Sequence, residues 1–279
     1  MRRPALDRQL FFVVGCQKSG TTWLQKLLDA HPNVRCDGEA RLASVLFPLM
    51  RQLQQEYNGR QKTGPHGNLT DQDTLVLCRA AVDRLYNHWL GDREPQIRAL
   101  GEKTPEHALF LPDLLTAFPR MKVIHIIRDG RDCCVSGYFH NLRTNPDEFR
   151  QRFPTLADYA RFMARAHWVA YVQSARAFAL QWPDRCVEVR YEHLHADPRP
   201  QVARLLGFLG VDASDAAVDG CVAAGSFESL AAGRPRGAED RASFFRKGVV
   251  GDWHGHLTGA ALDAFTAEAG PLLAELGYA

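Results

Sequence analysis

A short polar segment near the N-terminus carries the residue types of an anion-binding site. Residues 15–23 read GCQKSGTTW; they follow an apolar run and precede a helical pattern that begins at Thr21. A glycine-containing turn between a strand and a helix presents backbone N–H groups at the positive end of the helix dipole. Lys18 adds a positive charge, and the hydroxyls of Ser19 and Thr22 add donors. The pattern predicts a phosphate or sulfate site.

This segment departs from the P-loop that binds ATP or GTP. The P-loop places lysine directly after its second glycine, followed by a Ser or Thr for Mg²⁺. Here Thr21 follows Gly20, and the lysine has moved back to Lys18. The next long apolar run ends in Arg128, with Asp129 after it, rather than directly in an acidic residue that would help to hold magnesium. We therefore predict anion binding without a metal. A P-loop nucleotide-dependent kinase is the alternative, which Mg²⁺ dependence would identify.

Two further basic motifs lie downstream in the chain. The stretch IIRDGRDCCVS places Ser136 eight residues after Arg128, and residues 244–253 read FFRKGVVGDW. With the first segment, they resemble the three ordered motifs of the sulfotransferases that use 3′-phosphoadenosine 5′-phosphosulfate (PAPS). In that family a P-K-S-G-T-T-W loop binds the 5′-phosphosulfate; here Gln17 stands in place of the proline. The resemblance spans roughly residues 10–275 and is shared between cytosolic members and tyrosylprotein-type or bacterial members.

The resemblance implies which residues bind PAPS and the product adenosine 3′,5′-bisphosphate (PAP). PAPS is charged at both ends of its adenosine, so it needs two anion sites, and arginine pairs well with phosphate. The residues implied for the 5′-phosphosulfate are Lys18, Ser19, Gly20, Thr21 and Thr22. Those implied for the adenine are Trp23, Tyr191 and Phe227, and those for the 3′-phosphate are Arg128, Ser136, Arg246, Lys247 and Gly248.

Sulfuryl transfer also needs a base for the acceptor hydroxyl and cations for the charge on the leaving phosphate. The resemblance implies Lys18 for the bridging oxygen and Lys103, in GEKTPEH, near the transferred group. Cytosolic members carry K-T-H with the histidine as base, but Pro105 occupies that position here. The stretch LDAHPNVRCDGEAR resembles the other branch, in which a glutamate is the base, and this assigns the role to Glu39. That branch has a longer acidic string after its glutamate. His107 is the alternative base.

The sequence indicates the identity of the acceptor substrate less closely than that of the sulfuryl donor. A module that only bound PAP would keep the phosphate motifs without the base and Lys103, so their presence favours an enzyme with in-line, metal-independent transfer. The regions 40–100 and 140–155 carry no donor motif and are expected to line the acceptor site. Their mixed content fits a small aromatic alcohol, a carbohydrate or a peptide tyrosine. The dimer motif of cytosolic members retains only Thr258 here, which leaves the oligomeric state open.

These motifs must be positioned by alternating strands and helices. Buried strands are predicted at 10–15, 121–127 and 186–191. Helices are predicted at 21–31, 40–56, 71–91, 132–142, 155–182, 198–209, 214–224 and 259–276, the last interrupted by Pro271. Such alternation favours an α/β fold of three layers, with a central parallel sheet flanked by helices. The resemblance implies the P-loop-NTPase-like sulfotransferase fold. We expect a single domain over 1–279, with a helical insertion at about 40–100, a turn-rich loop at 58–68 and a long loop at 232–252.

The composition limits the class of protein. The chain has 279 residues, 46% hydrophobic and 24% charged, with a net charge of +2. This excludes a disordered chain and a generic polycation that binds nucleic acid. The seven cysteines form no C-x-x-C pair, which disfavours a zinc ribbon or disulfide framework and favours a reducing compartment. The apolar run near the N-terminus is too short for a signal sequence or a membrane span. We expect a cytoplasmic protein with no metal and no nucleic-acid or membrane partner.

Overall fold

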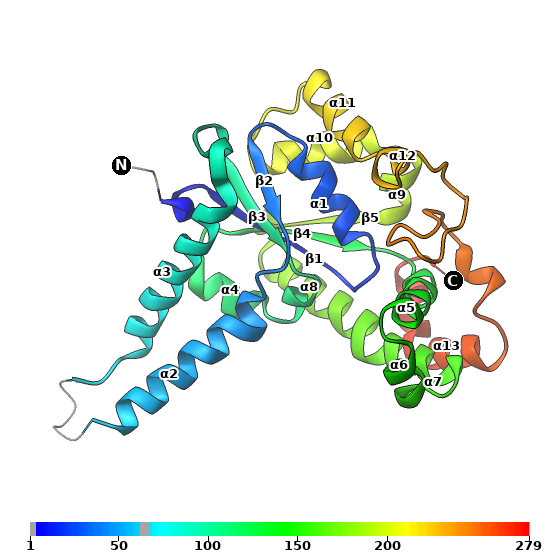
Figure 1. Ribbon diagram of the computed structural model, residues 1–279, viewed down its shortest axis with the longest axis horizontal. Helices are drawn as coiled ribbons and strands as arrows, with labels where there is room; N and C mark the ends of the chain where they lie inside the picture. The colour runs from blue at the N-terminus through cyan, green and yellow to red at the C-terminus, as the bar shows by residue number, and fades with distance from the viewer. Residues whose placement is uncertain (1–3, 62–66, 279) are drawn as a thin grey trace.

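A parallel five-stranded sheet forms the centre of the molecule (Figure 1). The computed structural model describes residues 4–61 and 67–278, so the predicted loop at 58–68 lies partly outside the described residues. The strand order is β2-β3-β1-β4-β5, and each neighbouring pair is parallel. The strands are β1 (Gln9–Val14), β2 (Val34–Asp37), β3 (Ala99–Lys103), β4 (Lys122–Ile127) and β5 (Cys186–Arg190). The predicted α/β class with a central parallel sheet is confirmed.

Helices lie on both faces of the sheet (Figure 1). They are α1 (Thr21–Asp29), α2 (Phe47–Gly59), α3 (Asp71–Leu90), α4 (Leu111–Ala117), α5 (Gly130–Thr144), α6 (Pro146–Arg152), α7 (Leu156–Phe162), α8 (Ala170–Gln181), α9 (Tyr191–Ala196), α10 (Pro198–Leu209), α11 (Asp215–Ala224), α12 (Phe227–Leu230) and α13 (Ala260–Glu275). A π-helical segment, Met163–Val169, joins α7 to α8, so the long helix predicted at 155–182 is continuous. The loop predicted at 232–252 has neither helix nor strand until a short 3₁₀ turn begins at Asp252.

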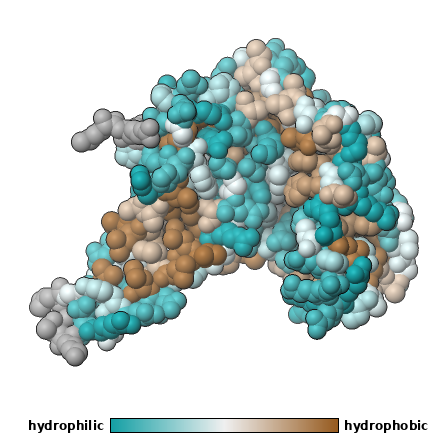
Figure 2. All heavy atoms as spheres, viewed as in Figure 1, coloured by the Kyte–Doolittle hydropathy of each residue, from teal (hydrophilic) through white to brown (hydrophobic). Residues whose placement is uncertain are grey.

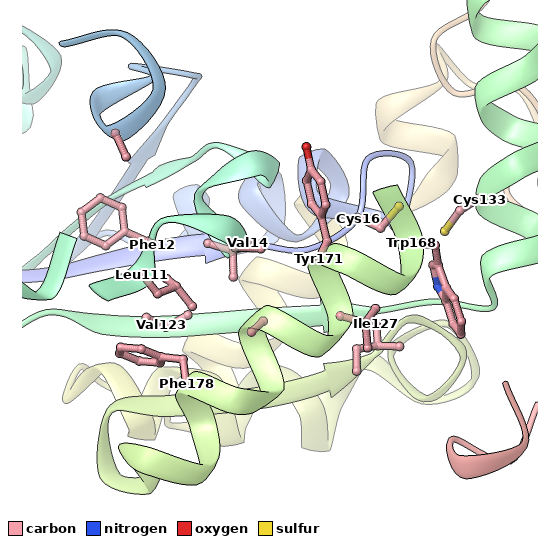
Figure 3. Packing of buried hydrophobic residues seen from close by; sticks show 14 of the residues in the cluster. Phe12, Val14, Cys16, Leu111, Val123, Ile127, Cys133, Trp168, Tyr171 and Phe178 are labelled. Atoms are coloured by element: carbon pink, nitrogen blue, oxygen red, sulfur yellow. The ribbon is translucent and has the colours of Figure 1, made fainter. Parts of the chain in front are cut away.

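The central strand β1 is buried on both faces, which accounts for the three layers of the fold. Its side chains alternate between the two faces, since successive residues of a strand point in opposite directions. Phe11 and Val13 pack with α1, α10 and α11 on one face. Phe12 and Val14 pack on the other face, where Figure 3 shows them with Tyr171 of α8. A strand buried on both faces reads as a continuous apolar run, which is why β1 was predictable from sequence.

Two of the five strands, β2 and β3, were not predicted. Both are short, and polar residues break their apolar runs. β3 contains Gly101, which is needed because a Cβ there would lie 2.5 Å from the ring of Phe11 in the adjacent strand. The buried Glu102 accepts hydrogen bonds from the hydroxyls of Tyr86 and Thr104, both at 2.9 Å. Partners from elsewhere in the fold therefore stabilise a strand that local sequence does not reveal.

The interruption predicted at Pro271 is wrong. Helix α13 runs from Ala260 to Glu275 through this proline. A proline inside a helix removes one backbone hydrogen bond and crowds the preceding turn. Leu272 and Leu273 directly after it are buried in the core, and their packing offsets that cost.

Helices α2 and α3 lie between β2 and β3 in the chain and extend away from the sheet as a hairpin (Figure 1). Apolar side chains gather on its surface, as Figure 2 shows. The exposed large apolar side chains of α2 and α3 are Leu49, Leu53, Tyr57, Val76 and Leu77, and Val45 lies just before α2. Across 4–61 and 67–278, none of the helices combines the length and apolar character that crossing a membrane requires.

Candidate active site

One cavity of about 350 Å³ collects the residues that follow the strands. Lys18 follows β1, Lys103 ends β3, Arg128 follows β4 and Tyr191 follows β5. The carboxyl ends of parallel strands meet at one edge of a sheet, where α/β proteins bind ligands. The residues of the implied site that line this cavity are Lys18, Gly20, Thr21, Thr22, Trp23, Glu39, Lys103, Arg128, Ser136, Tyr191, Phe227, Arg246, Lys247 and Gly248. The volume suits a small-molecule ligand.

The turn between β1 and α1 has an unusual backbone. Lys18 adopts a left-handed conformation with φ of 69°, which costs a non-glycine residue about 1–2 kcal/mol. Gly20 has φ of 99°, and a Cβ there would lie 2.6 Å from the ring of Tyr191. Strain at a ligand-facing turn persists only where the surrounding structure enforces it. The turn therefore places Lys18 in the cavity wall at a cost in backbone energy.

The Lys18 ammonium lies among other cations. Burial lowers the pKa of Lys18 to about 8, and nearby positive charges act in the same direction. These charges belong to Arg143, Lys103 and Arg128. The ammonium also lies 4.5 Å from the ring centroid of Phe244. A bound anion would relieve this repulsion, so the site is electrostatically suited to a negatively charged ligand.

Arg128, which lines the same cavity, connects three segments of the chain. Its guanidinium donates to the Lys18 carbonyl at 3.3 Å and to the Val249 carbonyl at 2.9 Å. It also pairs with Asp132 at 3.2 Å, and its Nε is buried without a hydrogen-bond partner among the described residues. The guanidinium carbon of Arg128 lies 4.3 Å from the ring centroid of Tyr191. Arg128 is thus held in place while its Nε–H remains unpaired.

Asp132 fixes the C-terminal motif against α5. Its buried carboxylate accepts from Arg128 Nη2 and from the backbone N–H groups of Gly251 at 2.9 Å and Trp253 at 3.0 Å. The Asp132 carboxylate thereby connects Arg128 to Gly251 and Trp253 of the FFRKGVVGDW motif.

We expect Asp132→Asn to weaken PAP binding by about 10- to 100-fold, because an amide keeps the shape but turns a donor toward groups that are themselves donors. Titration calorimetry with PAP measures this loss. Asp147→Asn is the matched control, because Asp147 is fully exposed on α6. An Asp132→Asn variant with unchanged PAP affinity would show that the motif holds its position without this carboxylate.

The basic residues of the C-terminal motif carry their own counterions. Asp252 accepts hydrogen bonds from Arg246 and, at 2.6 Å, from Lys247. Although burial raises it, these two bonds bring the pKa of Asp252 below its ordinary value. Arg246 also pairs with Glu239. Both cations are therefore positioned beside the cavity by pairs with carboxylates.

Three aromatic side chains, Trp23, Tyr191 and Phe227, line the same cavity. The indole of Trp23 donates to the Gly225 carbonyl at 2.8 Å and meets the ring of Tyr191 edge-on, with centroids 5.3 Å apart. Phe227 packs against Gly248, where a Cβ would lie 2.4 Å from the ring. Gly248 has φ of 67°, so glycine is favoured here for its backbone as well as for space. The arrangement offers apolar faces for a flat heterocycle.

Glu39 and Lys103 form an ion pair in the cavity wall. Lys103 Nζ lies 2.6 Å from Glu39 Oε1, and the Lys103 side chain is only 9% exposed. The second oxygen, Oε2, lies 3.7 Å from the Arg41 guanidinium, which is largely exposed. Glu39 thus lines the cavity between two cations, where its carboxylate can accept a proton from a bound group.

His107 and Ser19 are not brought into the cavity. His107 is fully buried, with Nδ1 3.0 Å from Glu102 Oε1 and Nε2 accepting from the Ala43 N–H at 3.4 Å. Nδ1 is buried beside Glu102 without a hydrogen-bond partner among the described residues, so the side chain lies in the core, away from the cavity. Ser19 is also fully buried, its N–H bonded to the Cys16 carbonyl at 3.1 Å. Neither residue lines the cavity.

The cavity includes residues that sequence reasoning did not assign to the site. They are Gln17, Arg41, Pro105, Glu106, His140, Leu230, Arg236, Phe244, Phe245 and Val249. His140 had a usable signal, since it lies four residues after Ser136 and such residues share a helix face. Phe244 had none beyond its place before the R-K-G motif.

The chain is similar to known proteins of one family. A model of the sulfotransferase family matches residues 11–215. Protein-tyrosine sulfotransferase 1 of Danio rerio is 30% identical over 214 residues, which are 75% of this chain and 55% of that protein. Protein-tyrosine sulfotransferase A of Caenorhabditis elegans is 28% identical over 208 residues, 73% of this chain and 50% of that protein. This chain thus spans about half the length of these two relatives.

A solved structure confirms the fold class. A mouse sulfotransferase complexed with PAP superposes with a TM-score of 0.60 at 20% identity, covering 98% of this chain and 89% of that chain. At this identity the likeness concerns the fold alone. The family model matches most of the chain and confirms the family predicted from the three motifs: the chain belongs to the sulfotransferase family.

Proposed function

We propose that this chain transfers the sulfuryl group of PAPS to a hydroxyl of an acceptor. One observation carries the proposal: a single cavity is lined by cationic residues from all three motifs, by three aromatic side chains, and by the Glu39–Lys103 pair. PAPS has the complementary pattern, with a phosphosulfate, an adenine and a 3′-phosphate. The buried Nε of Arg128, without a partner among the described residues, is a donor that a phosphate would satisfy.

The residues proposed to bind PAPS fall into three groups, one for each part of the molecule. Lys18, Thr21 and Thr22 on the turn after β1 would hold the phosphosulfate, at the N-terminus of α1. Arg128 and Ser136 from one side, and Arg246, Lys247 and Gly248 from the other, would hold the 3′-phosphate. Trp23, Tyr191 and Phe227 would enclose the adenine. We further infer one catalytic unit in which the α2–α3 hairpin is an insertion.

The reaction is an in-line displacement at sulfur. The acceptor oxygen forms a bond to sulfur while the bond from sulfur to the 5′-phosphate oxygen breaks, which leaves PAP and a sulfate ester. The hydroxyl proton passes to the Glu39 carboxylate. Lys18 offsets the negative charge on the departing phosphate oxygen, and Lys103 stabilises the transferred group. No step requires a metal.

A phenolic hydroxyl is the first acceptor to examine. Two relatives carry the name protein-tyrosine sulfotransferase. The cavity wall near Glu39 combines Pro105 with the charged side chains of Arg41 and Glu106, which suits an acceptor with an apolar ring and a polar surround. Small aromatic alcohols and carbohydrates are the other classes in the proposal.

Nucleotide binding should be independent of divalent metal. At PAP concentrations about 100 times its dissociation constant, we expect Tm to rise by about 5–10 °C, and the rise should persist in EDTA. Thermal unfolding with PAP, with ATP and with ATP plus Mg²⁺ measures this. Stabilisation by ATP that requires Mg²⁺, with none from PAP, would favour a kinase and refute the proposal.

A further inference from the structure

His140 is the cavity residue whose chemistry the proposed reaction leaves unused. It lies on α5 one turn after Ser136 and lines the same cavity as Lys18 and Glu39. Its ring meets Phe244 edge-on, with centroids 6.1 Å apart, while Lys18 lies over the same Phe244 ring. His140 is therefore in the wall near the lysine proposed to act on the leaving group.

Arg143 determines the tautomer of His140. Arg143 Nη2 lies 3.0 Å from His140 Nδ1. A guanidinium can only donate, so Nδ1 must accept, and the proton of the neutral ring is on Nε2. Among residues 4–61 and 67–278, the Nε2–H group donates a hydrogen bond to no other residue. The ring thus offers an N–H and no free lone pair.

The surroundings also keep the ring neutral. Burial lowers the pKa of His140 to about 4, and the positive charges of Lys18 and Arg143 act in the same direction. At neutral pH the ring is uncharged, with Nδ1 engaged by Arg143. Such a histidine is a poor base and a stable hydrogen-bond donor.

We propose that His140 is a positioning residue of the acceptor site, a neutral donor whose Nε2–H binds an oxygen of the acceptor. Arg143 sets its tautomer and also donates to the Ala242 carbonyl at 3.3 Å, which joins α5 to the loop that carries Phe244. The acceptor class follows from this chemistry: an alcohol or phenol whose oxygen accepts a hydrogen bond from His140 while its proton passes to Glu39. This inference rests on the proposed sulfuryl transfer.

Two variants separate a donor from a base. Glutamine can present an N–H at the place of Nε2 but cannot act as a base, whereas alanine can do neither. With a tyrosine peptide as acceptor, we expect His140→Ala to lower kcat/KM for the peptide by about 10- to 100-fold, with PAP affinity unchanged. His140→Gln should retain activity within about fivefold of the unchanged protein. Equal inactivation of both variants, or no loss in either, would overturn the proposal.

Nuclear magnetic resonance of nitrogen-labelled histidine provides a readout that does not depend on activity. The chain has 11 histidines, and the signals missing from His140→Gln identify the ring. We expect the Nε2–H tautomer at neutral pH and a titration midpoint well below the ordinary pKa of about 6.5. In Arg143→Met the midpoint should rise. An Nδ1–H tautomer or an ordinary midpoint would refute the inference about His140, whereas failure of PAP binding in the unchanged protein would refute the proposed function instead.

Discussion

Glutamine in place of Glu39 is expected to lower kcat by about two to four orders of magnitude, the usual contribution of a positioned general base. The amide keeps the size of the side chain and removes the site that accepts the proton. PAP affinity should stay within about twofold, because the proposed mechanism assigns Glu39 to the acceptor rather than to the nucleotide. Steady-state kinetics with saturating PAPS, together with PAP titration, measures both quantities.

A matched control lies two residues earlier in the chain. Asp37, at the end of β2, pairs with Arg35 and does not line the cavity. Asp37→Asn should therefore leave kcat nearly unchanged. A Glu39→Gln variant that keeps most of its turnover would remove Glu39 as the base while leaving the family assignment intact. Loss of kcat in His107→Gln, without loss of Tm, would then return the role to His107.

Methionine in place of Lys18 is expected to reduce both turnover and donor binding. Methionine keeps an unbranched stem and removes the charge. We expect a loss of kcat of about 10²–10³-fold, comparable to removal of an oxyanion donor, and a loss of PAPS affinity of about tenfold or more. Lys26→Met is the control, because Lys26 is exposed on α1, the helix that follows the Lys18 turn. A variant that lost affinity alone, with kcat intact, would exclude Lys18 from the transfer step.

The Lys18→Met variant also tests how the charge of Lys18 affects donor binding across pH. Since the folded pKa of Lys18 is lowered to about 8, its charge is present below that pH and is lost above it. Donor affinity should therefore fall between about pH 7 and about pH 9, and binding near pH 8 should take up protons as the anion restores the charge. Calorimetry in buffers of different ionisation enthalpy measures the uptake. Lys18→Met should show a flatter profile, and an equal slope in both proteins would assign the pH dependence to another group.

The elements that could be predicted from sequence are those whose own residue pattern determines their structure. The strands β1 and β4 are apolar runs because both of their faces are buried, and the turn at 15–20 follows from its glycines and hydroxyls. β3 could not be predicted in this way, because Glu102 and Lys103 are polar residues held by distant partners. Helix α13 continues past Pro271 because core packing, which periodicity does not record, outweighs one missing hydrogen bond.

The candidate site shows the same division. Three motifs identify most of the cavity, since residues at the carboxyl ends of neighbouring parallel strands must converge. Sequence cannot show that Asp252 pairs with Arg246 and Lys247, or that His107 is buried in the core beside Glu102. It also cannot show that Arg143 sets the tautomer of His140. Each of these depends on distances between side chains, and most of those side chains belong to different parts of the fold.

Sulfuryl transfer itself is the most direct test of the central claim. The measurement is the appearance of labelled sulfate on a tyrosine peptide, or on a small phenol or sugar, from sulfur-labelled PAPS in the presence of EDTA. We predict label on at least one hydroxyl acceptor, release of PAP in equal amount, no effect of EDTA, and loss of transfer in Glu39→Gln. Absence of label on every class of acceptor, from a folded protein that instead transfers the terminal phosphate of ATP when Mg²⁺ is added, would contradict it.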